Sequence, residues 1–341
     1  MGIPQGFKFM AFISSLMFTI NAWAAPTLIN GAGSTFAAPL YAKWVAEYKQ
    51  IDPQVEINYQ AIGSGGGIRQ FIAGTVDFGA TDDPMKKDEI EQVKGGVYHL
   101  PTAIGGIAIT YNVPGVTKTL KLTAEVIADI YLSKITKWDD AKIKALNPGI
   151  TLPPQFIVVA YRADGSGTTA VFTEYLSGAS AEWLGKAGKG KSIKFPTGLG
   201  GKGNEGVTGL VRQNPGAIGY VELTYAKVNN LTMAAIKNPA GQFVEPSLDS
   251  LTAAAASVKN VPADLRLSLL NAPGKTAYPI SVFTYLLVSQ KMDNNKGPKL
   301  VGFLNWALDK GQTVASTINY APLPEVVLRR AKQVVGMMST K

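Results

Sequence analysis

The sequence predicts an α/β protein of two domains, each an open sheet flanked by helices. Strand-like and helix-like segments alternate along the chain, and this alternation is typical of open α/β sheets. The chain has 341 residues, a length that corresponds to about two domains of ~150 residues each. Hydrophobic residues make up 46% of it, which is enough to bury a sizeable core.

The first 24 residues are predicted to be a cleaved secretory signal peptide. Lys8 supplies a positive charge, an apolar run covers residues 9–20, and Ala22-Trp23-Ala24 has the small-x-small pattern of a cleavage site. The run is too short for a membrane anchor, and no Cys follows it that could carry a lipid. We therefore expect a soluble mature chain that begins near Ala25 and works in the periplasm.

The elements of the first domain follow one another in β-α-β-α-β order. Leu40, Tyr41 and Trp44 have the spacing of a buried helix face. Pro39 falls in the first turn of that helix, where a missing N–H breaks no hydrogen bond. The expected order is a strand at 27–31, a helix at 37–49, a strand at 55–59, a helix at 63–72 and a strand at 78–80.

Two extended apolar segments are expected to link this domain to a second one. Residues 104–112 would carry the chain across, and residues 278–288 would return it. The first domain is thus predicted to comprise 25–107 plus 280–341, and the second 108–279. Between the crossings we expect a helix at 122–132, a strand at 156–161, a helix at 168–176 and a strand at 217–221; apolar spacing predicts C-terminal helices around 300–308 and 326–334.

Composition argues against an enzyme. The chain has no Cys and a single His, so a thiol nucleophile, a Cys- or His-rich metal site and a Ser-His-Asp triad are not expected. A phosphatase-like enzyme would need a metal cluster or an activated nucleophile. His99 lies in a strand-like run and is interpreted as structural. We predict no catalytic residue, no metal and no cofactor.

The net charge of +9 favours anionic partners. Nucleic acid is not expected, because the basic residues form no dense patch with interleaved aromatics. One group of lysines is scattered among glycines and is interpreted as solvated surface: Lys186, Lys189, Lys191, Lys194 and Lys202. Residues 185–192 match the P-loop pattern, but a helix precedes them and an extended segment follows, so we expect a surface loop.

Three turns rich in glycine and hydroxyl residues each precede a predicted helix. They are Gly31-Ala32-Gly33-Ser34-Thr35-Phe36, Gly63-Ser64-Gly65-Gly66 and Arg162-Ala163-Asp164-Gly165-Ser166-Gly167-Thr168. A helix N-terminus presents unpaired N–H groups and a positive dipole end, which bind small oxyanions. One such turn is usually only a helix cap. Three of them, one with an arginine, predict an anion site.

Five ordered motifs resemble the periplasmic phosphate-binding protein of the high-affinity phosphate ABC transporter. To the first and third turns above they add Asp77-Phe78-Gly79-Ala80-Thr81-Asp82, Lys137-Trp138-Asp139-Asp140 and Pro215-Gly216-Ala217-Ile218-Gly219-Tyr220-Val221. The resemblance implies a type II, Venus-flytrap fold with mixed sheets in two lobes that close around one phosphate. It further implies a monomer that delivers phosphate to an inner-membrane ABC permease.

The ligand set implied by this resemblance is Ser34, Thr35, Phe36, Ser64, Asp82, Arg162, Ser166, Gly167 and Thr168, with Asp164 supporting Arg162. A carboxylate at Asp82 could accept a hydrogen bond from the P–OH of phosphate and would repel sulfate, which has no proton. One departure is Asp83, where an uncharged residue is expected; it should point away from the site.

Simpler interpretations of these residues remain open at this stage. Arg162 and Asp164 could form a surface ion pair, and Asp82 could be a turn or helix-cap residue. Trp138 is interpreted as core packing. For the whole chain, the competing functions are binding of sulfate or molybdate, a phosphatase-like activity and a structural or adhesive role.

Overall fold

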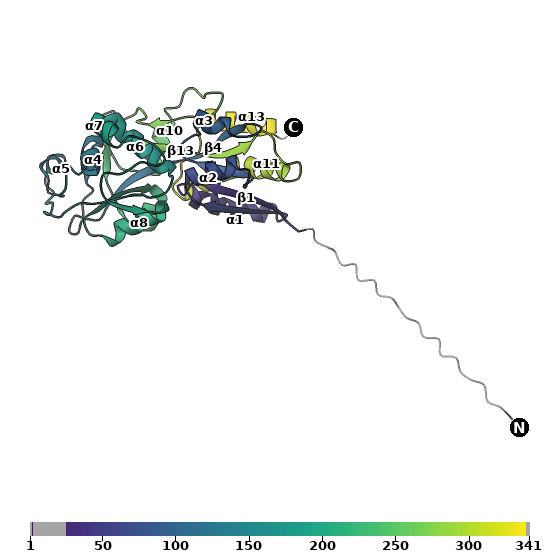
Figure 1. The fold of residues 1–341 in the computed structure, drawn as a ribbon, viewed down its shortest axis with the longest axis horizontal. Coiled ribbons are helices and arrows are strands. Elements are labelled where there is room, and N and C mark those ends of the chain that lie inside the picture. Colours follow the sequence, from purple (N-terminus) through teal and green to yellow (C-terminus); the bar gives the residue numbers. More distant parts are fainter. Residues whose placement is uncertain (1, 3–24, 339–341) are drawn as a thin grey trace.

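The computed structural model describes Gly2 and residues 25–338 of the chain. Apart from Gly2, the predicted signal peptide lies outside the described residues. Within them, no helix combines the length and the apolar character that crossing a membrane requires. Helices gather around two halves, α4 to α8 around one and α1, α2, α11 and α13 around the other (Figure 1).

Thirteen strands and thirteen helices are formed by the described residues. The strands are β1 Thr27–Gly33, β2 Val55–Ala61, β3 Phe78–Thr81, β4 Val97–Tyr111, β5 Lys121–Leu122, β6 Val158–Arg162, β7 Leu199–Gly201, β8 Ala217–Glu222, β9 Thr232–Met233, β10 Ala235–Lys237, β11 Phe243–Val244, β12 Leu269–Leu270 and β13 Ile280–Ser289. The helices are α1 Ala38–Ile51, α2 Ser64–Ile72, α3 Lys87–Glu91, α4 Ala124–Tyr131, α5 Ala141–Leu146, α6 Gly167–Ala179, α7 Ala181–Lys186, α8 Gly203–Gln213, α9 Leu223–Val228, α10 Leu248–Ala255, α11 Lys296–Ala307, α12 Lys310–Thr317 and α13 Glu325–Met338.

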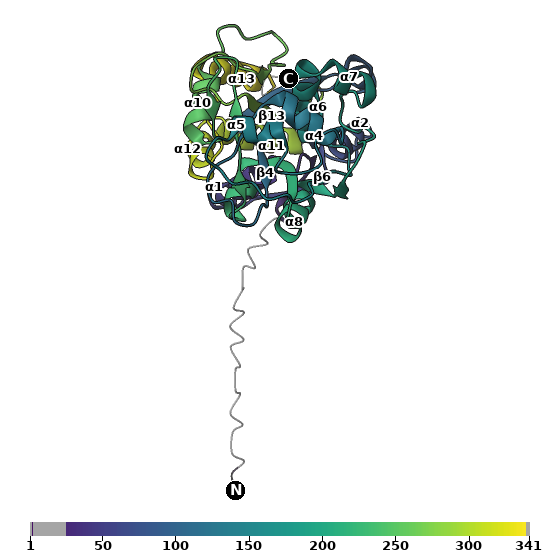
Figure 2. The ribbon, with the colours of Figure 1, turned by 90° about the vertical axis from the view of Figure 1, so that its left-hand side faces the viewer.

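One mixed sheet runs through both halves in the order β2-β1-β3-β13-β4-β8-β6-β7. The long strand β4 joins them: its residues 97–106 pair with β13, and residues 107–111 pair with β8. Strand β1 is parallel to β2 and β3, and β6 is parallel to β7 and β8. Helices lie on both sides of β4 and β13 (Figure 2). The protein is therefore a two-lobe α/β fold with mixed strand directions, as predicted, but one sheet continues through both lobes where a separate sheet in each was expected.

Aromatic clusters fill the core of each half. In the first half, the buried face of α1 places Trp44 against Trp306 of α11, with ring centroids 6.4 Å apart. In the second half, Phe172 of α6 stacks on Tyr220 of β8 at 4.1 Å. Such pairs add stabilisation beyond the apolar area that they bury. Trp138 is fully buried and donates a hydrogen bond to the carbonyl of Gly216, which confirms its predicted role in the core.

The structure contains every strand and helix that the sequence predicts within the described residues. Both linking segments are strands, β4 and β13, although the exact lobe boundaries remain a prediction. Several elements were not predicted, including α8 and α12. Helix α8 starts at Gly203 and contains two further glycines, Gly206 and Gly209, which hide its helical periodicity.

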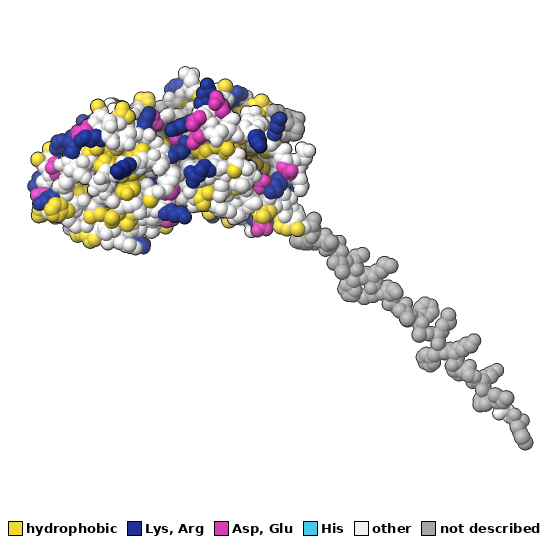
Figure 3. Space-filling view, viewed as in Figure 1, with side chains coloured by type: hydrophobic (Ala, Val, Ile, Leu, Met, Phe, Trp, Pro, Cys, Tyr) yellow, Lys and Arg dark blue, Asp and Glu magenta, His cyan; other side chains and the backbone are white. Residues whose placement is uncertain are grey.

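The loop that follows α7 confirms one prediction and corrects another. Residues 187–198 form no strand or helix, so the P-loop match has no structural basis. The side chains of Lys186, Lys189, Lys194 and Lys202 belong to exposed residues, as expected. The interpretation of Lys191 as solvated surface is wrong, because its side chain is only 10% exposed. On the face shown in Figure 3, basic side chains are interspersed with acidic and hydrophobic ones.

Candidate functional site

The three predicted turns meet where the two halves of the molecule face each other. The Gly65 N–H, in the first turn of α2, donates to the carbonyl of Gly165 just before α6, with N and O 2.8 Å apart. A Cβ added to Gly167 would lie 2.5 Å from Ser64 Oγ and 2.7 Å from Asp82 Oδ2. Only glycine therefore allows the start of α6 to approach the opposite half this closely.

Asp82 lies at the centre of this cluster and is only 3% exposed. Its carboxylate accepts hydrogen bonds from three hydroxyls: Ser34 Oγ at 2.5 Å, Thr284 Oγ1 at 2.9 Å and Ser64 Oγ at 3.2 Å. Burial raises the pKa of Asp82 to about 6, and the hydroxyl donors and the nearby charge of Arg162 offset part of this rise. Asp82 is not a helix cap, because α3 begins five residues later.

Arg162 is held by a two-pronged ion pair. Its Nε donates to Asp164 Oδ1 at 2.7 Å and its Nη2 donates to Asp164 Oδ2 at 2.6 Å, while Nη1 donates to Thr168 Oγ1 at 3.3 Å. The Arg162 side chain is 1% exposed, so the surface ion-pair interpretation is wrong. Burial alone would raise the pKa of Asp164, but its hydrogen bonds and ion pair with Arg162 outweigh burial and lower it. The guanidinium is thus a fixed, buried positive charge.

Thr35, Phe36 and Ser166, the remaining predicted residues, belong to the same cluster. Thr35 and Phe36 are buried, and the carbonyl of Phe36 accepts a hydrogen bond from Tyr320 OH at 2.6 Å. Ser166 Oγ accepts from the N–H of Thr169 at 3.0 Å and so caps α6. The structure therefore brings all nine predicted residues, and Asp164, into one region.

A fourth helix N-terminus, that of α8, joins the cluster and was not predicted. The Gly203 N–H donates to Asp164 Oδ1 at 3.0 Å, and Asn204 donates to Thr35 Oγ1 from Nδ2 at 2.8 Å. The signal was present as the glycine-rich run at 198–203, which resembles the other three turns. Thr284 was also missed, because nothing in the sequence relates it to Asp82 across 202 positions.

Glu222, at the end of β8, is a second buried carboxyl beside this cluster. It accepts hydrogen bonds from the N–H of Thr224 at 2.8 Å and from Thr224 Oγ1 at 3.3 Å. Burial raises the pKa of Glu222 to about 8, although hydrogen bonds from Thr224 reduce the rise. At neutral pH the carboxyl is therefore predominantly protonated.

The protonation of Glu222 predicts a pH-dependent contribution to stability. The folded-state pKa of about 8 lies above the ordinary glutamate value of 4.5, so between these values the folded state holds the extra proton. The free energy of unfolding should fall as pH rises through this window, by up to about 1.4 kcal/mol per pH unit. Urea denaturation at pH 5.5 and 7.5 should show this loss in the parent and a smaller loss in Glu222→Gln. The control, Glu125→Gln on the exposed surface of α4, should lose as much unfolding free energy between the two pH values as the parent does. An equal loss in Glu222→Gln would show that folded Glu222 is ionised at both pH values.

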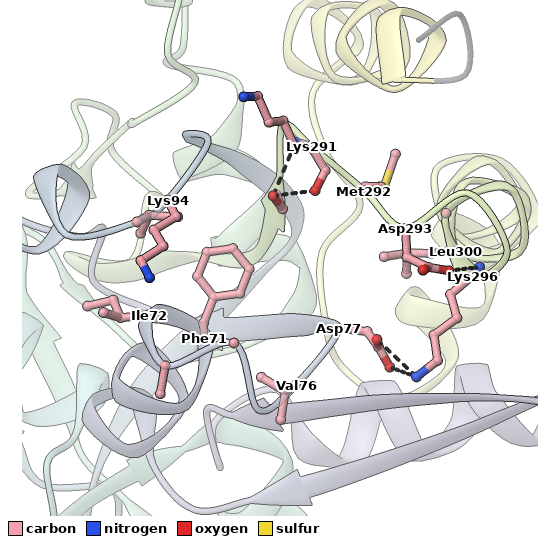
Figure 4. Close-up of a pocket in the computed structure, with 15 residues that line it drawn as sticks. Phe71, Ile72, Val76, Asp77, Lys94, Lys291, Met292, Asp293, Lys296 and Leu300 are labelled. Carbon is pink, nitrogen blue, oxygen red and sulfur yellow. Dashed lines mark hydrogen bonds and ion pairs between the residues drawn. The ribbon is translucent and has the colours of Figure 1, made fainter.

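A separate pocket lies away from this cluster, between the end of α2 and residues 289–300 (Figure 4). Lys296 Nζ faces it but is paired with Asp77, with Nζ and Oδ2 3.0 Å apart. None of the nine predicted site residues lines this pocket. Among the described residues there is also no group of three or more His, Asp or Glu side chains that could hold a metal ion.

His99 has the structural role expected of it. It is buried, and its Nε2 accepts a hydrogen bond from the N–H of Met85 at 3.1 Å. Burial lowers the pKa of His99 to about 4, so the ring is neutral and can act as this acceptor near neutral pH.

The fold and the buried polar cluster between its halves define a two-lobe binding protein. A family model described as a PBP superfamily domain matches residues 21–310. The phosphate-binding protein PstS of Haemophilus influenzae is 44% identical over 313 residues, covering 91% of this chain and 93% of that protein. PstS of Pasteurella multocida is 45% identical over 324 residues, covering 94% and 93%. The chain belongs to the PstS family of phosphate-binding proteins.

The fold agrees with that of solved phosphate-binding proteins. The periplasmic phosphate-binding protein PfluDING, solved with phosphate bound at pH 8.5, superimposes with a TM-score of 0.73 at 21% sequence identity. The match covers 90% of this chain and 93% of the PfluDING chain. At this identity, the comparison supports the two-lobe fold.

Proposed function

We propose that this chain is the substrate-binding component of an ABC importer, which captures inorganic phosphate in the periplasm and delivers it to an inner-membrane permease. It acts as a monomer whose lobes, 25–107 plus 280–341 and 108–279, close around the ligand. The observation that carries the proposal is a buried carboxylate, Asp82, among hydroxyl and backbone N–H donors and near a guanidinium, Arg162, that is paired with Asp164.

This combination of groups suits a protonated oxyanion. The Arg162 guanidinium, whose Nε and Nη2 already bind Asp164, can offer its remaining N–H groups to the oxygens of the anion, together with hydroxyl and backbone N–H donors. The carboxylate of Asp82 can only accept while ionised, so it requires a proton on the ligand. Phosphate carries such a proton near neutral pH, whereas sulfate and molybdate carry none. Inorganic phosphate therefore satisfies both kinds of group.

Titration calorimetry of the purified mature chain against phosphate, sulfate and molybdate tests the proposal. Phosphate should bind with one site per chain, and neither of the other anions should compete at comparable concentration. If sulfate or molybdate bound more tightly than phosphate, that anion would be the ligand in place of phosphate. Failure to bind any of the three would contradict the proposed function.

Lobe closure is expected on phosphate binding, because the predicted contacts come from both halves of the molecule. Thr35, Ser64 and Asp82 precede β4, whereas Arg162 and Thr168 follow it. Small-angle scattering should give a smaller radius of gyration with saturating phosphate than without it. An unchanged radius, with binding confirmed by calorimetry, would indicate a rigid, preformed site.

A further inference from the structure

Three charged side chains form an ion cluster beside the candidate site. Lys191 Nζ lies 2.8 Å from Asp83 Oδ2 and 3.5 Å from Glu89 Oε2, and it also donates to the carbonyl of Pro84 at 3.5 Å. The side chains of Asp83 and Glu89 are 27% and 24% exposed, so the whole cluster is largely shielded from water. An ion pair that is partly removed from solvent is screened less by salt than a surface pair.

The cluster joins the two halves of the molecule beside the site. Asp83 directly follows Asp82, and Glu89 belongs to α3 of the same half. Lys191 belongs to the loop after α7 in the other half, and its carbonyl accepts a hydrogen bond from the Ser166 N–H at 2.8 Å. Lys191 is thereby connected to one wall of the site through its backbone and to the other wall through its ammonium group.

The two acidic partners are held in place before Lys191 reaches them. The Glu89 carboxylate accepts from the N–H of Lys86 at 2.7 Å. The backbone of Asp83 is fixed by Thr81, whose hydroxyl donates to the Asp83 carbonyl at 2.5 Å and accepts from the Asp83 N–H at 3.3 Å. Closing the lobes therefore brings the ammonium group to acceptors that are already ordered, which limits the entropy lost in forming the pair.

We propose that Lys191, with Asp83 and Glu89, is an electrostatic latch that favours the closed form and sets the rate at which phosphate leaves. This inference rests on the proposed function and adds a residue set that controls it. Opening the lobes separates the ammonium group from both carboxylates, so the attraction contributes to the closed state alone. Contacts present only in the closed state act mainly on dissociation, while association from the open state is little changed.

Lys189 provides a matched control within the same loop. It carries the same charge two residues away, but its ammonium pairs with Glu174 of α6 at 2.8 Å, inside one half of the molecule. Lobe opening leaves that pair intact, and Lys189 interacts with the other half only through a smaller attraction to Asp83, so its removal should alter release far less. Lys189→Gln and Lys191→Gln remove the same charge and differ in whether the lost pair spans the lobes.

The test is stopped-flow release of phosphate from each loaded mature chain into an excess of a fluorescent phosphate sensor. Lys191→Gln should release phosphate about 5- to 30-fold faster than the parent. Its association rate and the release rate of Lys189→Gln should both stay within about twofold of the parent values.

A double-mutant cycle separates a latch from a general disturbance of the loop. Asp83→Asn alters the other half and should also accelerate release. The release rate of the double variant Asp83→Asn/Lys191→Gln should rise by clearly less than the product of the two single-variant increases. Fully multiplicative effects, or unchanged release in Lys191→Gln while the parent binds phosphate normally, would overturn the latch and leave the proposed function standing. A parent chain that binds no phosphate would overturn both.

Discussion

Replacing Arg162 with Ala should weaken phosphate binding by about 2–5 kcal/mol, a loss of roughly 30-fold to several thousand-fold in affinity. The guanidinium is buried and oriented by the two oxygens of Asp164, so it faces the site as a preorganised positive charge. Hydroxyl and backbone N–H donors would remain and should leave weak binding. Titration calorimetry against phosphate measures the difference directly.

Part of that loss would come from Asp164, because its buried carboxylate would lose its partner. The double variant Arg162→Ala/Asp164→Asn removes this second effect and should recover some affinity. Arg329→Ala is the matched control, since the Arg329 side chain is 69% exposed on α13 and should not affect binding. If Arg162→Ala binds phosphate as tightly as the parent, the guanidinium does not contact the anion.

Asp82→Asn should increase sulfate affinity relative to phosphate by about tenfold or more. A hydrogen bond to a charged group contributes about 1.5–3 kcal/mol, and the ionised carboxylate also repels a proton-free dianion. Asparagine keeps the size of the side chain and offers donors as well as an acceptor. Competitive calorimetry of phosphate and sulfate at fixed pH measures the change. A variant that rejects sulfate as strongly as the parent would place selectivity in the shape of the site.

The raised pKa of Asp82 predicts that sulfate binding depends on pH. With a pKa of about 6, the carboxyl gains a proton as pH falls through 6 and then no longer requires a proton on the ligand. Sulfate binding by the parent should therefore strengthen between pH 7.5 and pH 5. In Asp82→Asn the sulfate affinity should change less over the same range, because position 82 no longer titrates.

The sequence predicted the fold well because local signals and the global fold agree at most elements. Trp44 lies on a helix face with clear periodicity, and β4 and β13 are long apolar runs. Where glycine removes the side chains that would reveal a period, as in α8, the helix was missed. The glycine-rich turn that ends at Gly203 could have indicated the start of α8, because similar glycine-rich turns precede α2 and α6.

The candidate site was predictable where residues cluster in the chain and unpredictable where only the fold unites them. Residues 166–168 are recognisable in the sequence as a turn before a helix. Thr284 contacts Asp82 only because β13 lies beside β3, and Asn204 contacts Thr35 only because α8 packs against the site. No spacing in the sequence relates the members of either pair. The misjudged burial of Lys191 has the same cause, since its acidic partners lie about 100 residues earlier in the chain.

A crystal structure of the mature chain grown with phosphate tests the central claim most directly. The account predicts one phosphate between the lobes, with an oxygen within hydrogen-bond distance of an Asp82 carboxylate oxygen and others bound by the Arg162 guanidinium and the N-terminus of α6. Phosphate bound elsewhere, for example beside Lys296 in the pocket of Figure 4, with Asp82 and Arg162 making no contact to it, would contradict the account.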